Sequence, residues 1–505
     1  MGPDYTLRGS MASASDSEPD PRPPGTEVLD TPAAGSLVIR GGAIRAVGYV
    51  VGVALSVVAV AILIRQLGAA DYGRYVTVIS LVTIVGAMAE AGMTNLGIRE
   101  YSTLEGRERD RLMRNLLGLR LAISVIGLAV AVVFALAAGY TDTMVVGTLV
   151  AGAGLILANL QSSLTVPLAA ALALGRVTVL DLLRQVVTVV ATAALAAAGA
   201  GLLAYLAVPL PAAAAALVLT VAWVRGAIPL VAAFDAALWR RLIRIIASFA
   251  AAAAVGTLYV YVIVLVMSLV SSEREIGYFG ASFRVFLVVG SVAGLLVSVA
   301  FPVLSRAARD DHERLRYALQ RLFEVSVIVG TWGALGTVLG APVAIDVVAG
   351  SNFGPAVPTL QIQGAAVFAS FLLATWGFAL ISLHRHAALL IANGVALVLS
   401  VGFSLALVPG MGAKGAGVTT VIGETGLALA YIVALVRHSP ELRPRLGVLA
   451  KVVPAGLLGL GAGLVPGLDP LPSVVVASAV YAAAILGLRA LPQELLDAVP
   501  HRGRR

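Results

Sequence analysis

Long apolar runs separated by short polar loops repeat along the chain from Ile44 towards its C-terminus. A helix of about 20 residues, rising about 1.5 Å per residue, is long enough to cross the hydrocarbon core of a bilayer. The pattern therefore predicts about fourteen membrane-spanning helices. We place them at 42–64, 72–92, 116–138, 144–171, 179–198, 202–224, 245–270, 277–304, 322–347, 357–383, 387–408, 415–436, 448–465 and 472–488.

Composition supports a membrane protein. The 505 residues are 59% hydrophobic and 12% charged, with a mean hydropathy of +0.96, whereas a soluble domain carries about 25% charged residues. The predicted fold class is therefore an all-α polytopic membrane protein. The chain has no cysteine, which excludes disulfide bonds, thiolate catalysis and cysteine-ligated zinc.

Basic residues alternate between loops, and this alternation predicts the topology. Lysine and arginine accumulate in cytoplasmic loops, and every second loop of this chain is basic: Arg107, Arg109, Arg111 and Arg114, then Arg176, then Arg225, Arg240, Arg241 and Arg244, and so on to Arg502, Arg504 and Arg505. The pattern predicts an even number of spans and two cytoplasmic termini. It also assigns the net charge of +8 to contacts with anionic lipid rather than nucleic acid.

An internal similarity divides the chain into two halves. The stretch 67–100, LGAADYGRYVTVISLVTIVGAMAEAGMTNLGIRE, is similar to 275–306, EIGYFGASFRVFLVVGSVAGLLVSVAFPVLSR, when Gly73 is aligned with Gly277. A charged loop and another apolar run follow each copy. Each copy ends a predicted pair of helices, and an even number of spans before the second pair predicts parallel repeats related by an axis along the membrane normal. We expect two six-helix bundles followed by two additional helices.

These patterns predict six segments. A disordered cytoplasmic tail at 1–38 is rich in proline, serine and acidic residues. The N-terminal bundle spans 39–225, a cytoplasmic linker 226–244, and the C-terminal bundle 245–437. The two additional helices occupy 446–489, and a cytoplasmic tail occupies 490–505.

No constellation typical of an enzyme is present in the sequence. The five histidines fall in or beside predicted cytoplasmic loops without metal-ligand spacing, and the chain has no G-x-x-x-x-G-K-[ST] phosphate loop. We therefore expect no catalytic residues, no metal site and no cofactor.

Charged side chains inside the spans are the main candidates for function, because a charge at the bilayer centre costs at least about 2.5–3.5 kcal/mol. Arg284 lies deep in its span, and either lines a central path that receives an anion or forms a buried ion pair with an acid such as Glu90 or Glu424. Three further cavity candidates lie near the membrane faces, where their side chains can instead extend to the headgroups: Arg45, Arg65 and Arg74.

The remaining polar candidates have two readings each. Glu90 and Glu424 either carry a coupling ion or pair with arginines. Asp181 is placed to pair with Arg184 on one helix face. Four amides either face the cavity or form interhelical hydrogen bonds: Gln361, Gln363, Asn159 and Gln161.

The stretch 67–100, the run FPVLSR at 301–306 with its charged loop, and the helix start at 415–420 after the turn at 409–410 resemble the Wzx-type polysaccharide flippases. These belong to the multidrug/oligosaccharidyl-lipid/polysaccharide (MOP) exporter superfamily. The resemblance implies two six-helix bundles around a central cavity in the inner membrane. It implies translocation of a polyprenyl-diphosphate-linked oligosaccharide by alternating access, with membrane lipids, a polysaccharide polymerase or glycosyltransferases as partners. Coupling to H⁺ or Na⁺ stays open.

Four other functions are weighed. A cation-coupled multidrug exporter of the same superfamily would need an acid in the first or seventh span, and 42–64 and 245–270 contain none. A flippase for the peptidoglycan precursor lipid II would share an arginine-lined cavity. A membrane-embedded glycan polymerase would need a long catalytic loop outside, which we do not predict. A scaffold would not need Arg284 so deep.

Overall fold

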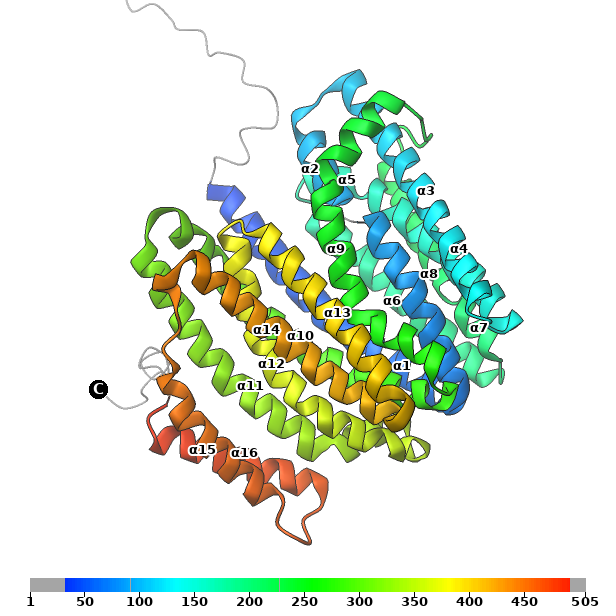
Figure 1. The fold of residues 1–505 in the computed structure, drawn as a ribbon. Helices are drawn as coiled ribbons and strands as arrows, with labels where there is room; N and C mark the ends of the chain where they lie inside the picture. Colours follow the sequence, from blue (N-terminus) through cyan, green and yellow to red (C-terminus); the bar gives the residue numbers. More distant parts are fainter. Residues whose placement is uncertain (1–31, 91, 227, 491–505) are drawn as a thin grey trace, which may run out of the picture.

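The computed structural model describes residues 32–90, 92–226 and 228–490, and these form a bundle of long helices (Figure 1). Thirteen of the described helices are long and apolar enough to cross a membrane. The first of them, Val47–Thr103, is broken at Gly68, whose backbone (φ 68°, ψ 178°) is not helical. It therefore contains the first two predicted spans, and the all-α polytopic fold is confirmed.

The first group of helices follows the first predicted bundle. Helix α1 packs on α3, α4 and α6, while α8 packs on α4 and α6. The helices of this group are α1 (Pro32–Glu90), α2 (Met93–Thr103), α3 (Gly106–Ala137), α4 (Asp142–Leu164), α5 (Val166–Ala170), α6 (Leu174–Ala197), α7 (Leu202–Ala207) and α8 (Pro209–Val224).

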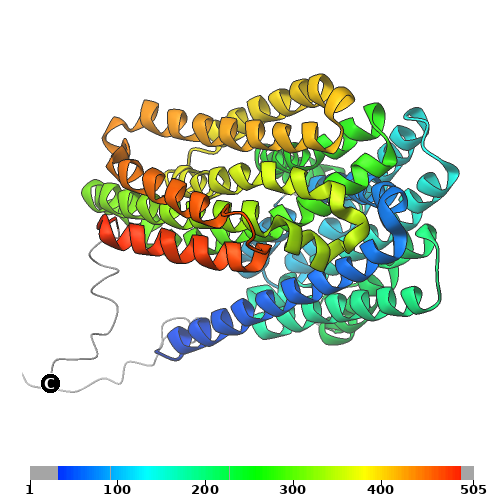
Figure 2. The same cartoon turned by 90° about the horizontal axis from the view of Figure 1, so that it is seen from below.

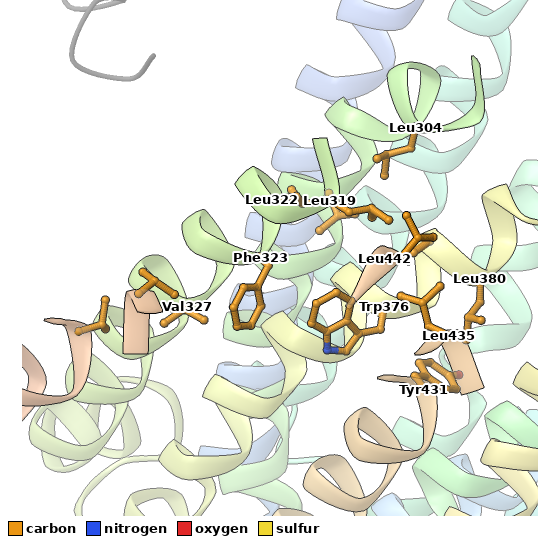
Figure 3. Close-up of a cluster of buried hydrophobic side chains, with 14 of the residues drawn as sticks. Leu304, Leu319, Leu322, Phe323, Val327, Trp376, Leu380, Tyr431, Leu435 and Leu442 are labelled. Carbon is orange, nitrogen blue, oxygen red and sulfur yellow. The ribbon is translucent and has the colours of Figure 1, made fainter. Parts of the chain in front are cut away.

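The second group packs around α12, which contacts α10, α11 and α14, and α13 lies on both α9 and α14. In its apolar core the rings of Phe323 and Trp376 stack with centroids 5.3 Å apart (Figure 3). The helices of this group are α9 (Ala236–Val270), α10 (Glu273–Asp310), α11 (His312–Ala349), the 3-10 turn η1 (Ser351–Ala356), α12 (Val357–Ser382), α13 (His386–Met411) and α14 (Ala413–His438).

Two additional helices complete the described chain. After two short turns, η2 (Pro440–Leu442) and η3 (Leu446–Val448), α15 (Leu449–Gly463) and α16 (Pro470–Gly487) pack on each other and on α11. The start of α1 and the end of α16 lie at the same end of the bundle (Figure 2), which we call the terminal end. The opposite end, where α1 turns, is called the Gly68 end.

The structure corrects several predicted boundaries. The span 144–171 divides into α4 and α5, and the span 202–224 into α7 and α8. Pro167 and Pro209 each lie in the first turn of the second piece, because proline lacks the N–H group that a helix interior requires. Helix α1 begins at Pro32, within the tail predicted at 1–38. The rest of that tail and residues 491–505 lie outside the described residues.

The aligned glycines of the two repeats meet at the Gly68 end. A Cβ atom on Gly73 would lie 1.8 Å from the carbonyl oxygen of Glu273, and one on Gly277 would lie 1.9 Å from that of Ala69. Only glycine permits so close an approach of two backbones. At the terminal end the start of α9 also packs on α3, so a second contact between the groups lies there.

Candidate functional site

Two adjoining cavities lie between the groups of helices, each about 420 Å³ in volume. The deep chamber, nearer the Gly68 end, is lined by α1, α4, α6, α8, α9 and α10 and includes Tyr72, Tyr75 and Tyr261. The arginine chamber, nearer the terminal end, is lined by α1, α6 and α10 and includes Arg45 and Asp181. The two chambers share the lining residues Ser56, Arg184, Gln185, Arg284 and Leu287.

Arg284 lies where the two chambers meet. It is about three turns into α10, and its guanidinium donates a hydrogen bond to the hydroxyl of Ser56 on α1. Its Nε is buried without a hydrogen-bond partner, and no salt bridge to Arg284 forms within the described part of the chain. Its charge is therefore available to an anion in the cavity.

The arginine chamber has an excess of positive charge. Three arginines line it, Arg45, Arg184 and Arg284, against one acid, Asp181. The predicted pair between Arg184 and Asp181 is present, with Nη2 3.1 Å from Oδ1. The side chains are 39% and 58% exposed, so this pair remains open to solvent or ligand. Two of the cavity candidates, Arg45 and Arg284, therefore line the same chamber, and Arg184 lines it too.

The alternative in which Arg284 pairs with a buried acid is wrong. Glu90 is held by Arg120, whose Nη2 lies 2.9 Å from Glu90 Oε2. The carboxylate of Glu424 accepts hydrogen bonds from Tyr259 at 3.0 Å and from Ser370 at 2.8 Å. Both acids therefore have partners within their own groups of helices.

The two other arginine candidates lie outside both chambers. Arg65 donates from Nη2 to the carbonyl oxygens of Asp346 at 3.1 Å and Val347 at 2.7 Å. These carbonyls belong to the last turn of α11, where the helix dipole favours a cation. Arg74 is 2.7 Å from Glu273, across the contact between the aligned glycines. Its predicted place in the cavity is corrected, because this ion pair holds it at the Gly68 end.

None of the four amide candidates lines either chamber. Asn159 donates to Ser124 at 2.9 Å and Gln161 to Thr220 at 3.3 Å, so both follow the interhelical reading. Gln361 is exposed and its Nε2 is 3.4 Å from the carbonyl oxygen of Val338. Gln363 is fully buried, and neither its amide nitrogen nor its amide oxygen has a hydrogen-bond partner among the residues that the structure describes.

Several lining residues were not singled out from the sequence. They are the hydroxyl and amide side chains Ser56, Tyr72, Tyr75, Gln185 and Tyr261. Such groups are common in apolar helices, and their hydrogen bonds are easily met within the bundle, so they carry little signal alone. The one available sign was that Tyr72 and Tyr75 belong to the repeated stretch 67–100.

Comparison with known proteins places the chain in a family. Residues 62–358 match the family model described as "Polysaccharide biosynthesis protein". No curated protein matches the sequence. The structure of lipid II flippase MurJ in an inward closed conformation is similar at a TM-score of 0.75 and 12% identity, over 88% of this chain and 99% of that one.

Two further solved structures share the fold. An inward-facing multidrug resistance MATE family transporter of the MOP superfamily has a TM-score of 0.60 at 15% identity, over 77% of this chain and 95% of that one. A MOP superfamily transporter from Pyrococcus furiosus has a TM-score of 0.55 at 15% identity, over 84% of this chain and all of that one. The family match extends over more than half of the chain, and the chain therefore belongs to the polysaccharide biosynthesis protein family, with the fold of the MOP superfamily transporters.

Proposed function

We propose that this protein is a flippase that moves a polyprenyl-diphosphate-linked oligosaccharide from the cytoplasmic to the outer leaflet of the inner membrane by alternating access. In this proposal the terminal end faces the cytoplasm. The chambers receive the polar head group, and the polyprenyl tail remains in lipid.

The observation that carries the proposal is the unpaired guanidinium of Arg284 at the junction of two chambers in a membrane-spanning bundle. By Born estimates, moving an isolated ion from water into an apolar medium costs tens of kcal/mol. A diphosphate that crossed the bilayer unaided would face a cost of this order. Guanidinium groups replace water around phosphate oxygens because they are planar, bidentate and always charged. Arg45 and Arg184 add to this field.

The closed contact at the Gly68 end supports alternating access. Gly73 meets Glu273 and Gly277 meets Ala69 at that end, and from this contact the deep chamber and then the arginine chamber follow towards the terminal end. Rocking one repeat against the other would break this contact and expose the chambers to the outside. With the inside of the cell negative, each negative charge moved outward gains about 2.3 kcal/mol per 100 mV.

A second candidate substrate is lipid II. It is favoured by the likeness to the lipid II flippase MurJ, and it too has a diphosphate head group. The match to a polysaccharide biosynthesis family favours the oligosaccharide. A cation-coupled multidrug exporter is the least favoured, because three arginines and one acid line the arginine chamber, and this excess of positive charge disfavours a cationic substrate.

If transport is coupled to an ion, we propose Glu424 as the group that carries it. Its carboxylate is held by the hydroxyls of Tyr259 and Ser370 rather than by a cation. Glu90 is the weaker candidate, because its charge is balanced by Arg120. A polysaccharide polymerase or glycosyltransferases stay as proposed partners.

The test is complementation of a strain that lacks its own lipid-linked oligosaccharide flippase. Wild type should restore export, Arg284→Ala should not, and Arg284→Lys should restore it in part, because ammonium keeps the charge without the bidentate geometry. Arg437→Ala is the matched control, since Arg437 is exposed in the last turn of α14, away from the chambers. Equal rescue by all variants would refute the role of Arg284. Failure of wild type to reduce the lipid-linked sugar on the cytoplasmic leaflet would refute the function.

A further inference from the structure

The deep chamber has a lining unlike that of the arginine chamber. Apart from Arg184 and Arg284 at the junction, its lining side chains are all uncharged. Its polar groups are hydroxyls and one amide: Ser56, Tyr72, Tyr75, Ser80, Thr83, Gln185, Thr188, Thr192 and Tyr261. The remaining lining residues are apolar. A positively charged region therefore passes into a neutral, hydroxyl-rich one along the same cavity.

Three tyrosines in this lining have hydroxyls that are not used by the protein. Within the described residues, the hydroxyls of Tyr72, Tyr75 and Tyr261 form no hydrogen bond with another group. None of the three is among the buried polar atoms that lack a partner, so these hydroxyls are reached from the cavity. Donors and acceptors left free in a bundle interior are expected to be satisfied by water or by a ligand.

Two of the tyrosine rings, those of Tyr72 and Tyr75, are packed against other aromatic rings. Tyr72 and Tyr75 lie nearly parallel, with ring centroids 6.2 Å apart and an interplanar angle of 16°. The ring of Phe353 contacts Tyr72 edge-on at 6.3 Å, and Tyr72 is only 4% exposed. A rigid aromatic surface with free hydroxyls loses little entropy when it binds a ligand.

The two linings match the two parts of a sugar diphosphate. A sugar ring has apolar C–H faces and a rim of hydroxyls, which suits aromatic rings interleaved with neutral hydrogen-bonding groups. A diphosphate needs positive charge and bidentate donors. The volume of about 420 Å³ is within the range of about 300–1,000 Å³ for small-molecule sites, so the chamber suits a short oligosaccharide rather than a polymer.

We propose that the deep chamber is a glycan subsite, in which Tyr75 and Tyr261 bind the sugars nearest the diphosphate while Arg284, at the junction, binds the diphosphate itself. This inference rests on the proposed function and refines it by dividing the head group between the chambers. The sugars then lie towards the Gly68 end and the diphosphate towards the terminal end. Sugars carrying a positive charge are disfavoured, because Arg184 and Arg284 flank the chamber.

The test measures binding of soluble probes to the full-length protein purified in detergent. The probes are farnesyl diphosphate, farnesyl-diphosphate-hexose and farnesyl-diphosphate-N-acetylhexosamine. We expect at least one sugar conjugate to bind wild type more tightly than bare farnesyl diphosphate. Tyr75→Phe and Tyr261→Phe should each reduce that sugar-dependent gain by about 2- to 12-fold, the worth of one neutral hydrogen bond, and should leave farnesyl diphosphate binding unchanged. Arg284→Ala should weaken all three probes.

Controls separate the two proposals. Tyr101→Phe changes a tyrosine on α2 that lines neither chamber, and it should behave as wild type. If wild type does not bind farnesyl diphosphate, both the flippase proposal and the glycan subsite are overturned. If farnesyl diphosphate binds but neither sugar adds affinity, or the gain survives in the Tyr75→Phe/Tyr261→Phe double variant, only the glycan subsite is overturned. Phenylalanine keeps the ring packing, and the unchanged binding of farnesyl diphosphate reports correct folding.

Discussion

The two groups of helices place buried polar side chains in contrasting ways. In the first group, Arg120 is 1% exposed and contacts Glu90 at 2.9 Å. It also donates to Thr94 Oγ1 at 2.9 Å and to the carbonyl oxygen of Asn159 at 3.1 Å. These contacts join α1, α2, α3 and α4 through one cation.

The second group contains a different feature, an acid whose partners are neutral. Glu424 on α14 is held by hydroxyls from α9 and α12, and no salt bridge to it forms in the described part of the chain. The carboxylate of Glu424 therefore has neutral partners, whereas that of Glu90 is paired with a cation. The comparison teaches that similar helical packing can contain either an ion pair or an acid that is held by hydroxyls.

The largest effect is expected at the contact where the groups meet. Gly73→Val would place a side chain 1.8 Å from a backbone carbonyl, so the closed state should be lost almost completely, and Gly277→Val should behave alike. Because the chain has no cysteine, a single Ser80→Cys in the deep chamber reports access. In the Gly73→Val and Gly277→Val variants, an impermeant maleimide added from outside should label this cysteine faster than it does when Ser80→Cys is the only change.

Gly294→Val on the same helix as Gly277 is the control, since nothing lies within 4 Å of the added Cβ. Unchanged labelling in both Gly73→Val and Gly277→Val would show that this contact does not close the chambers.

A large loss of stability is expected from Arg120→Leu. Breaking a fully buried pair costs about 3–5 kcal/mol. Arg120 is 1% exposed but Glu90 is 43% exposed, so water solvates part of the carboxylate that is left, and the free energy of unfolding in detergent should fall by less than that amount. Arg184→Leu breaks an exposed pair and should cost only about 0–1 kcal/mol. Equal melting temperatures for the two variants would contradict the structural role of Arg120.

A moderate effect is expected at Glu424. Replacing it with alanine leaves the hydroxyl of Tyr259 without its acceptor, whereas that of Ser370 keeps the carbonyl oxygen of Ala366 at 3.0 Å. An unsatisfied buried donor costs about 1–3 kcal/mol in unfolding free energy. Glu424→Gln keeps an acceptor and should be nearly as stable as wild type. If Glu424 carries a coupling ion, Glu424→Gln will lose export while keeping its stability. Full export by Glu424→Gln would remove this residue from the transport mechanism.

The smallest effect is expected at Asp235, which connects the groups at the start of α9. Its carboxylate pairs with Arg111 and accepts from the backbone N–H groups of Ala237 and Leu238. The hydrogen bond from Arg111, followed by that from Leu238, lowers the pKa of Asp235 below its usual 3.8. A lowered pKa stabilises the folded state above the unfolded pKa, and this contribution is lost as the pH falls through the folded value.

Asp235→Asn keeps a side-chain oxygen that can cap α9 but removes the negative charge, so it isolates the contribution of that charge to stability. Its melting temperature should be slightly below that of wild type at neutral pH, and the difference should shrink below pH 4 or so, around the ordinary carboxyl pKa of 3.8. A difference that is constant across this range would exclude the charge as its cause.

The amino-acid sequence by itself determined the fold class. Apolar runs of spanning length leave the backbone no alternative to helices in lipid, because every N–H and C=O group must be satisfied internally. The aligned glycines, Gly73 and Gly277, marked the repeat, and the structure brings the two together. The pair of Asp181 and Arg184 was also predictable, because both lie on one helix.

Only the tertiary structure decided which charges remain free. Arg65, Arg74, Arg120 and Arg284 all lie in apolar runs, and sequence cannot show that three of them find partners on other segments. Arg65 binds carbonyls of α11, Arg74 binds Glu273, and Arg120 binds Glu90. These contacts join residues far apart in the chain, so they depend on helix packing rather than on local pattern. Arg284 alone of the four faces the chambers without a carboxylate or carbonyl partner in the described chain, because α10 turns it towards Ser56 and the cavity.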